Sequence, residues 1–395
     1  MSTKKRVNVL ENFGNSVNCY SKKGKLTPGY SAVNVPGEHP DVVTFAKYSK
    51  MTEKYFICTP ASLNVSTDGK NFPYYTNFDG SSPFLIEEYI DGSGCSIVIS
   101  GRDSMLDSPE IGSKNKLPYS LNCGVLHCGR LFGGDGYTLR WSGSEDPRSW
   151  SEGLHSSGYL KLEPERGKIL NLLVYGGKLV AVREYGLTVF SMHGAPENFS
   201  VSFTDTDCDC IYRNTACVVS GKIYFCSLSG LKSFNGTAIS PLELKYAVSG
   251  AKSAVEYGGK YFLACKSEAL KSNVILCVDA DLESCIIDAS ADVLFVKDGV
   301  RFFNSNGQYI LERGGEYKFV SSVIDFGTDR MKTITELKVK GKATISIMTE
   351  RLINVYKVKD GTARPHMRGK HFTVIAEGSE DVSEISITAE VMNAI

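Results

Sequence analysis

Short apolar runs separated by glycine turns recur along this chain. In "YGGKLVAVREYGLTVFS" (175–191), one apolar strand enters a glycine turn, a second strand leaves it, and a third follows another turn. The same layout recurs in "VVSGKIYFCSLSGLKSFNG" (218–236), and again at 255–279 and 293–314. Apolar runs of this length between glycine turns predict β-hairpins. Each segment is therefore expected to form three or four consecutive strands.

The repeat extends toward the N-terminus with a regular spacing. Looser members lie at 126–143, 87–108 and 46–72. The central second-strand residues of the seven units are Phe56, Ile97, Phe132, Val180, Phe225, Phe262 and Phe302. Successive members of this series are 35 to 48 residues apart, which is the spacing of β-propeller blades. We therefore predict an all-β chain with a β-propeller of about seven blades. An irregular β-sandwich is the alternative.

The pattern changes near residue 320. Strict alternation of apolar and polar residues in "ELKVKGKATISI" predicts longer strands with one solvated face, as in a sandwich. We expect a small C-terminal β-sandwich over 320–395 and the propeller over 41–319. Residues 1–40 are expected to form an extended N-terminal segment that supplies a ring-closing strand.

Composition narrows the classes of partner and compartment. Lys plus Arg and Asp plus Glu both number 44, so the net charge gives no long-range attraction for nucleic acid or an anionic membrane. No apolar run reaches the roughly 18 residues of a membrane span, and no signal peptide or membrane anchor is visible. Most of the twelve cysteines, such as Cys58, Cys226 and Cys265, lie within apolar runs. We expect buried thiols in a reducing compartment and no disulfide scaffold.

Two turns resemble the aspartate boxes of sialidase propellers. In "STDGKNF" (66–72), Ser66 and Asp68 are expected to accept backbone hydrogen bonds while Phe72 packs beneath the turn. These roles are structural. A sialidase also needs an arginine cluster, but Arg6 is followed by no arginine until Arg102. Sialidase chemistry is therefore not expected.

The second such turn is "WSGSEDPRSW" (141–150). We interpret it as the link between the blade at 126–143 and the next strand, closed by Asp146. Trp141 and Trp150 then pack between blades. Stacking of a sugar on these tryptophans is the alternative.

No convergent catalytic pair is visible in the sequence. Glu87 and Glu88 are adjacent, so in a strand they face opposite sides and cannot flank one glycosidic bond. We expect no enzyme activity, no cofactor and no metal. A zinc site between two cysteine-rich stretches stays open as an alternative. Its candidate ligands are Cys123, His127, Cys128, Asp205, Asp207, Cys208, Asp209 and Cys210.

The order of segments resembles the β-propeller proteins of bacteriophage virions, in particular the tail-accessory or tail-hub proteins of short-tailed phages. The resemblance lies in "NFGNSVNCYSKKGKLTPGYSAVNV" (12–35), which leads into the first blade, and in the blade with serine, acid, proline and tryptophan at 139–190. It continues in "MRGKHFTVIAEG" (367–378), within the strand-rich C-terminal part.

This resemblance implies a structural virion protein of the tail or neck, made in the bacterial host cytoplasm. Such a protein forms a ring of identical copies, joins the portal or adaptor to tail proteins, and helps retain packaged DNA. If DNA passes through the lumen, Lys338, Lys340 and Lys342 are candidate contacts. A propeller at the tail tip that binds or hydrolyses carbohydrate is the alternative function.

Overall fold

The computed structural model describes residues 3–22, 24–90, 92–107, 112–150, 156–205 and 208–391. Over these ranges the chain is almost entirely β-structure. The helices found there are three single 3₁₀ turns, at Val9–Glu11, Pro164–Arg166 and Pro196–Asn198. No helix in this part of the chain has the length and apolar character needed to span a membrane.

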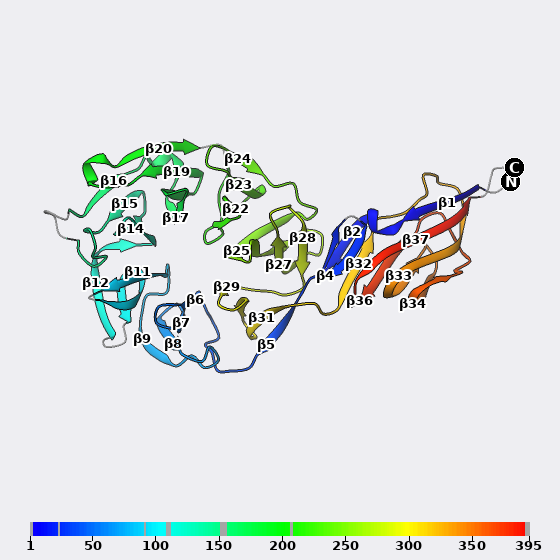
Figure 1. Ribbon diagram of the computed structural model, residues 1–395, viewed down its shortest axis with the longest axis horizontal. Coiled ribbons are helices and arrows are strands. Elements are labelled where there is room, and N and C mark those ends of the chain that lie inside the picture. The colour runs from blue at the N-terminus through cyan, green and yellow to red at the C-terminus, as the bar shows by residue number, and fades with distance from the viewer. Residues whose placement is uncertain are drawn as a thin grey trace. The chain divides into compact units, whose positions relative to one another are not determined.

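Seven sheets follow one another along the chain as the blades of a β-propeller (Figure 1). Six blades have four strands and one has three within the described ranges. The strands of the first four blades are β6 (Phe45–Ser49), β7 (Lys54–Cys58), β8 (Ser62–Ser66) and β9 (Tyr74–Asn77); β10 (Phe84–Ile90), β11 (Ser93–Asp107) and β12 (Gly112–Leu121); β13 (Cys123–His127), β14 (Arg130–Asp135), β15 (Thr138–Trp141) and β16 (Gly158–Lys161); and β17 (Ile169–Tyr175), β18 (Lys178–Arg183), β19 (Gly186–Ser191) and β20 (Ser200–Asp205).

The last three blades have the same strand order, and the seventh takes its fourth strand from the N-terminal region. Their strands are β21 (Cys217–Val219), β22 (Lys222–Ser227), β23 (Gly230–Phe234) and β24 (Ile239–Pro241); β25 (Val248–Tyr257), β26 (Lys260–Ser267), β27 (Ser272–Val278) and β28 (Ser284–Ile287); and β29 (Val293–Val296), β30 (Val300–Asn304), β31 (Gly307–Arg313) and β5 (Tyr30–Val35).

The predicted repeat coincides with these blades. The seven marker residues lie on β7, β11, β14, β18, β22, β26 and β30, which are the second strands of the seven sheets. All seven side chains are buried. Between two consecutive blades, for example, Val180 and Val189 pack in one apolar cluster with Phe225 and Phe234. Because each blade covers the face of the next, the hairpins bury surface that none could bury alone. The all-β, seven-bladed propeller is confirmed.

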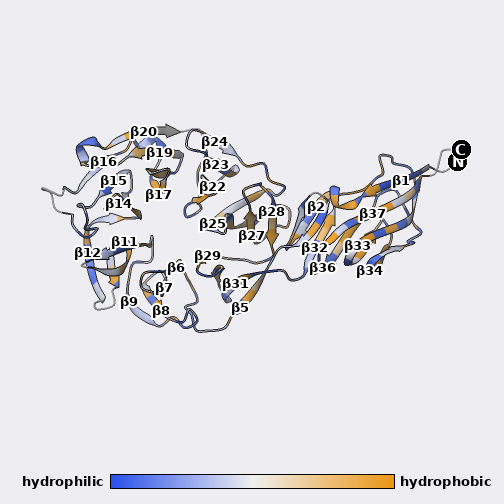
Figure 2. Cartoon of the chain, in the orientation of Figure 1, coloured by the Kyte–Doolittle hydropathy of each residue, from blue (hydrophilic) through white to orange (hydrophobic). Residues whose placement is uncertain are grey.

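The N-terminal and C-terminal strands form a separate sheet of ten strands. These strands are β1 (Thr3–Asn8), β2 (Phe13–Val17), β3 (Cys19–Lys22), β4 (Lys25–Pro28), β32 (Tyr317–Ser321), β33 (Lys332–Met348), β34 (Ile353–Ala363), β35 (Met367–Gly369), β36 (Thr373–Gly378) and β37 (Val382–Val391). Buried and more exposed positions alternate along β36, most of β33 and part of β37, and hydrophobic and hydrophilic residues are interspersed on these strands (Figure 2), so each has one more deeply buried face.

The long strand β33 gives this sheet its sandwich-like form. Along one edge β33 pairs with β34, and along the other it pairs with β37 up to Gly341 and with β36 from Thr344 onward. Gly341 has φ +113°, and a Cβ there would lie 2.4 Å from the carbonyl oxygen of Asp381. Only glycine fits this corner without displacing the backbone. The strand thereby contributes Leu337 and Ile345 to one apolar core.

Two compact units result, and their boundaries differ from the predicted ones. One unit comprises 1–33, 269–289 and 311–395, and the other comprises 34–268 and 290–310. The predicted N-terminal segment contains more than a ring-closing strand, because β1 pairs with β37 over its whole length and β4 pairs with β37 at one position. Alternation within a strand shows that it has a buried face, but it does not show which distant strand is its partner.

None of the twelve cysteines forms a disulfide, and most are buried. Burial, together with the nearby negative charge of Asp209, raises the pKa of the Cys226 thiol to about 12, and burial raises the pKa of Cys19 to about 12. Such thiols stay protonated and behave as small apolar side chains.

Candidate functional site

One carboxylate closes the turn at 66–72. The Oδ1 atom of Asp68 accepts hydrogen bonds from the backbone N–H groups of Lys70 and Asn71, at 2.8 and 2.9 Å. The hydroxyl of Ser66 donates to the same oxygen at 2.8 Å. The Asp68 carboxylate therefore satisfies the turn's own donors, and its role here is structural.

Aromatic rings pack beneath this turn. Phe72 is buried, with its ring centroid 5.6 Å from that of Phe303 and 6.3 Å from that of Tyr55. Gly69 lies above the Tyr55 ring at φ +67°, and a Cβ at this position would approach the ring to 2.5 Å. The turn is thus fixed from below by the contact between its glycine and the aromatic cluster.

We predict that Asp68→Ala lowers the melting temperature of the propeller most at neutral pH. Hydrogen bonds from the backbone of Asn71, and then of Lys70, hold the pKa of Asp68 well below its usual value. A depressed pKa contributes stability above the unfolded-state value of about 3.9, and this contribution is lost as the pH falls through the folded-state value. Between pH 7 and pH 2, the difference in melting temperature between wild type and variant should therefore shrink toward the acid end.

Asp68→Asn is the matched control for charge. It keeps a side chain of the same shape with an oxygen acceptor, so its loss at pH 7 should be smaller than that of the alanine variant. Two parallel curves for wild type and Asp68→Ala, with no convergence at low pH, would contradict the assigned role.

The tryptophans of "WSGSEDPRSW" lie in different apolar clusters of the propeller. Trp141 is buried, 5.2 Å from Phe199 between ring centroids. A Cβ on its cross-strand partner Gly158 would lie 2.6 Å from the indole. Trp150 is partly buried, with its ring 5.7 Å from Tyr119. The buried position of Trp141 leaves its ring face unavailable for stacking on a sugar.

Asp146 closes the turn between them. Its Oδ1 accepts a hydrogen bond from the backbone N–H of Arg148 at 2.9 Å and a second from the Arg148 Nε at 3.1 Å. The backbone carbonyl of Asp146 accepts from the N–H of Ser149 at 3.1 Å. This carboxylate, like that of Asp68, is thus occupied by its own turn.

The three lysines considered for DNA lie on β33, and each contacts a glutamate. The Nζ atoms of Lys338 and Lys340 lie 3.6 and 3.0 Å from Glu384 Oε2. Lys342 Nζ lies 2.9 Å from Glu380 Oε1. The hydrogen bond from Lys340 lowers the pKa of Glu384, which therefore remains charged. These partners could not be recognised from the sequence, because the glutamates lie far along the chain, on β37 and in the turn before it.

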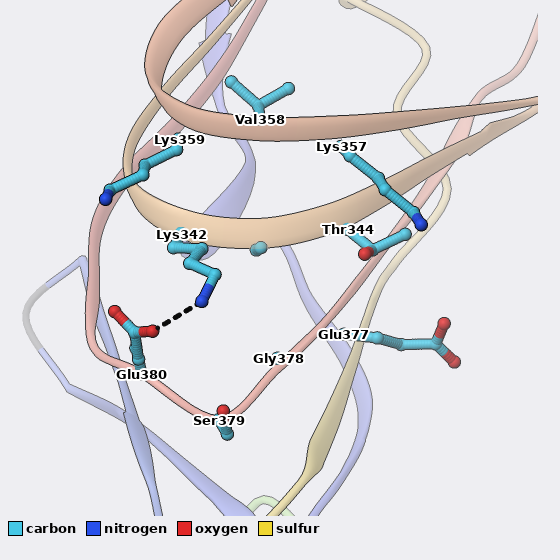
Figure 3. Close-up of a pocket in the computed structure, with 10 residues that line it drawn as sticks. Lys342, Thr344, Lys357, Val358, Lys359, Glu377, Gly378, Ser379 and Glu380 are labelled. Atoms are coloured by element: carbon cyan, nitrogen blue, oxygen red, sulfur yellow. Dashed lines mark hydrogen bonds and ion pairs between the residues drawn. The ribbon is translucent and has the colours of Figure 1, made fainter.

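Lys342 also borders a hollow of about 240 Å³ on this unit. Its lining residues are Lys342, Ala343, Thr344, Lys357, Val358, Lys359, Glu377, Gly378, Ser379 and Glu380. Lys357 and Lys359 extend from β34 on the same side as Lys342, and Val358 points away from them (Figure 3). Lys359 stands opposite Lys342 in the strand register. Like charges at this spacing repel, and the salt bridge to Glu380 offsets part of that repulsion.

On the exposed side of β34, apolar residues lie next to these lysines. We call this surface the β34 face, and it consists of Ile353, Val355, Lys357 and Lys359. Ile353 and Val355 are each 60% exposed, whereas the intervening Tyr356 and Val358 pack against the core. Among the described residues, β34 is paired with β33 alone. This strand therefore offers an unpaired edge beside an apolar and basic surface.

Glu87 and Glu88, the adjacent acids of the second blade, accept hydrogen bonds from nearby groups. Glu87 Oε1 accepts hydrogen bonds from the Ser49 hydroxyl at 2.6 Å and from the Met51 N–H at 3.1 Å. Glu88 accepts from the backbone N–H of Tyr89 at 2.9 Å. Both carboxylates are thus engaged in local structure.

The β34 face could not be recognised from the sequence. Exposed apolar residues on a strand look like buried ones until the pairing of the sheet is known.

Comparison with known proteins bears on the fold. No protein family and no curated protein matches this sequence. Among solved structures, the chain is similar to the extracellular domain of a protein described as a one component system, BT4673, from B. thetaiotaomicron. The TM-score is 0.51 at 12% sequence identity, over 86% of this chain and 47% of that one. BamB from Moraxella catarrhalis superposes with a TM-score of 0.43 at 12% identity, over 79% of this chain and 97% of that one.

At this level of identity, the first similarity concerns the fold alone. The chain spans about half the length of that extracellular domain. The weaker superposition on BamB carries no argument. The described side chains, and the surfaces they form, are therefore the basis for proposing a function.

Proposed function

We propose that this chain is a non-catalytic structural protein that assembles with other copies of itself through the β34 face. The observation that carries this proposal is the exposure of Ile353 and Val355 on a strand with an unpaired edge. Apolar residues placed together on such an edge favour the addition of a further strand or sheet.

A second copy is the occupant that suits this surface. Positive and negative side chains both number 44, so copies approach one another without net repulsion. Lys357 and Lys359 extend the apolar pair with positive charge, which an acidic surface of the neighbouring copy can offset. A contact repeated around an axis closes into a ring when the rotation divides a full turn.

We further propose that this ring belongs to a bacteriophage tail or neck. There it would join the portal or adaptor to tail proteins of the same virion and help retain packaged DNA. The support is the order of segments at 12–35, 139–190 and 367–378, together with the propeller that this resemblance implies. DNA is the weaker proposed partner, because Lys338, Lys340 and Lys342 each contact a glutamate.

The test of self-association is the mass of the full-length protein in solution. We expect wild type to have a mass that is a multiple of 43.2 kDa, with each interface burying more than about 1,000 Å². Val355→Asp should shift it to the monomer, because a charge replaces an apolar contact at the centre of the interface. Light scattering after size-exclusion chromatography gives both masses.

Val323→Asp is the matched control, since Val323 is 62% exposed in the same unit but lies outside β34. This variant should keep the wild-type mass. Wild type that stays monomeric at every concentration would contradict self-association. An oligomer that survives Val355→Asp unchanged would show that another surface forms the contact.

Carbohydrate binding by the propeller is a second candidate. Tyr74 and Tyr75 on β9 and Tyr89 on β10 are exposed, and aromatic rings of this kind stack on sugars. The Arg140 guanidinium lies 3.8 Å from the centre of the Tyr119 ring. Retention of the protein on immobilised oligosaccharides, lost in Tyr89→Ala, would favour this function.

A further inference from the structure

An unusual turn joins β13 to β14. β13 ends at His127 and β14 begins at Arg130, so Cys128 and Gly129 form a two-residue hairpin loop. Both have positive φ, +49° and +70°, as a type I′ turn requires. Asparagine, aspartate or glycine normally fills the first of these positions, and a cysteine there carries backbone strain. Strained positions of this kind cluster at functional sites, so the side chain of Cys128 is a candidate for a role.

A third residue meets this turn from the following blade. His193 comes two residues after β19, and its Nδ1 lies 3.3 Å from Cys128 Sγ. The Nε2 of His127 lies 3.5 Å from the same sulfur. The two imidazole rings are 5.2 Å apart between centroids. One ligand atom from each of the three residues lies within 4.8 Å of the other two.

These separations match those around a tetrahedral zinc ion. Bonds of 2.3 Å to sulfur and 2.0–2.1 Å to nitrogen place a sulfur and a nitrogen ligand about 3.6 Å apart. The two sulfur–nitrogen distances here are 3.3 and 3.5 Å. The two nitrogens lie within 4.8 Å of each other, against roughly 3.4 Å in such a tetrahedron, and the exposed His193 has room to turn toward His127.

We propose that His127, Cys128 and His193 form a binding site for a zinc-like divalent cation, with the remaining coordination position open to solvent. Two imidazoles and one thiolate favour zinc and similar ions over magnesium or calcium, which prefer oxygen ligands. His127 is buried and its ring packs against Phe132, so one ligand is held in place before the metal binds. Cys128 and His193 are exposed, which gives the ion access.

This site differs from the one left open by the sequence. Cys123 belongs to a buried apolar cluster, and Asp209 Oδ1 lies 2.7 Å from the Nζ of Lys232, so each has another role. The Asp207 candidate and the side chain of Asp205 lie outside the described residues. His193 replaces them, although 65 residues separate it from Cys128. Because the ligands come from consecutive blades, the bound ion would link β13 to the segment after β19. The site is independent of the β34 face.

The test is titration of the full-length, metal-stripped protein with cobalt(II), followed by competition with zinc. We expect one cobalt ion per chain and a sulfur-to-cobalt charge-transfer band that zinc abolishes. Zinc should also slow the reaction of Cys128 with a thiol reagent at least ten-fold and raise the melting temperature. Cys128→Ser should lose the band, and His193→Asn should weaken binding at least about ten-fold.

Cys128→Gly separates the effect of metal binding on stability from an effect of the substitution on folding. Glycine accepts the positive φ without strain, so this variant should melt no lower than metal-free wild type and should show no rise with zinc. His371→Asn, which changes a half-exposed histidine on the ten-stranded unit, should bind cobalt like wild type. A missing band in wild type, or an identical band in Cys128→Ser, would overturn the proposal.

Discussion

Replacing Phe225 with aspartate is expected to lower the free energy of unfolding of the propeller by at least about 4 kcal/mol. Phe225 lies on β22, is fully buried, and packs with Val180 and Val189 of the preceding blade. The variant loses this apolar contact and places an unpaired carboxylate between two blades. A urea titration measures the change, and Trp141 and Trp150 supply the fluorescence signal because both belong to the propeller unit.

Leu228→Asp is the control within the same blade. Leu228 follows β22 directly but is 61% exposed, so its substitution should change the stability by no more than about 0.5 kcal/mol. Equal losses in the two variants would mean that Phe225 does not pack between blades. That result would contradict the role assigned to the second strand of each repeat.

Replacing Ile345 with aspartate is expected to unfold the ten-stranded sheet selectively. Ile345 lies on β33 with no measurable exposure and is part of the core of that unit. Its loss should cost about 4 kcal/mol, as for any unpaired charge in a packed sheet. Hydrogen exchange should rise in peptides from β33, β36 and β37. The tryptophan transition of the propeller should move much less.

Ile353→Asp gives the matched comparison. It makes the same chemical change on the neighbouring strand, at a side chain that is 60% exposed. Exchange in β33 should stay close to wild type in this variant. Protection lost equally in both variants would show that β34 belongs to the packed interior, which would also remove the basis for the β34 face.

Point substitutions test the C-terminal strands better than truncation does. On the domain boundary predicted near residue 320, deletion of residues 320–395 is expected to leave a folded propeller. In the structure this deletion removes β33 to β37 and takes the pairing partner from β1. It would also uncover Leu10 and Leu26, which are buried in the shared core. Loss of assembly in such a truncation would therefore not distinguish docking from misfolding.

The propeller could be predicted from the local pattern of residues alone. Glycine turns and apolar runs recur because every blade is built from hairpins that must bury both faces. The markers from Phe56 to Phe302 could therefore be placed on the correct strands without knowledge of any distant contact. The acidic turns at Asp68 and Asp146 were accessible for the same reason, since their hydrogen bonds reach only two or three residues along the chain.

Features that depend on pairing between distant strands could be recognised only in the folded chain. The segment Thr3–Asn8 is largely polar and carries no sign of its partner strand, and its pairing with β37 followed from the fold. The sequence does not show that Lys340 contacts Glu384 or that Cys128 lies beside His193. The number of residues between the members of each pair has no relation to the contact they make. Local periodicity reports whether a face is buried. Which side chains then meet across 44 or 65 residues depends on how the sheets close.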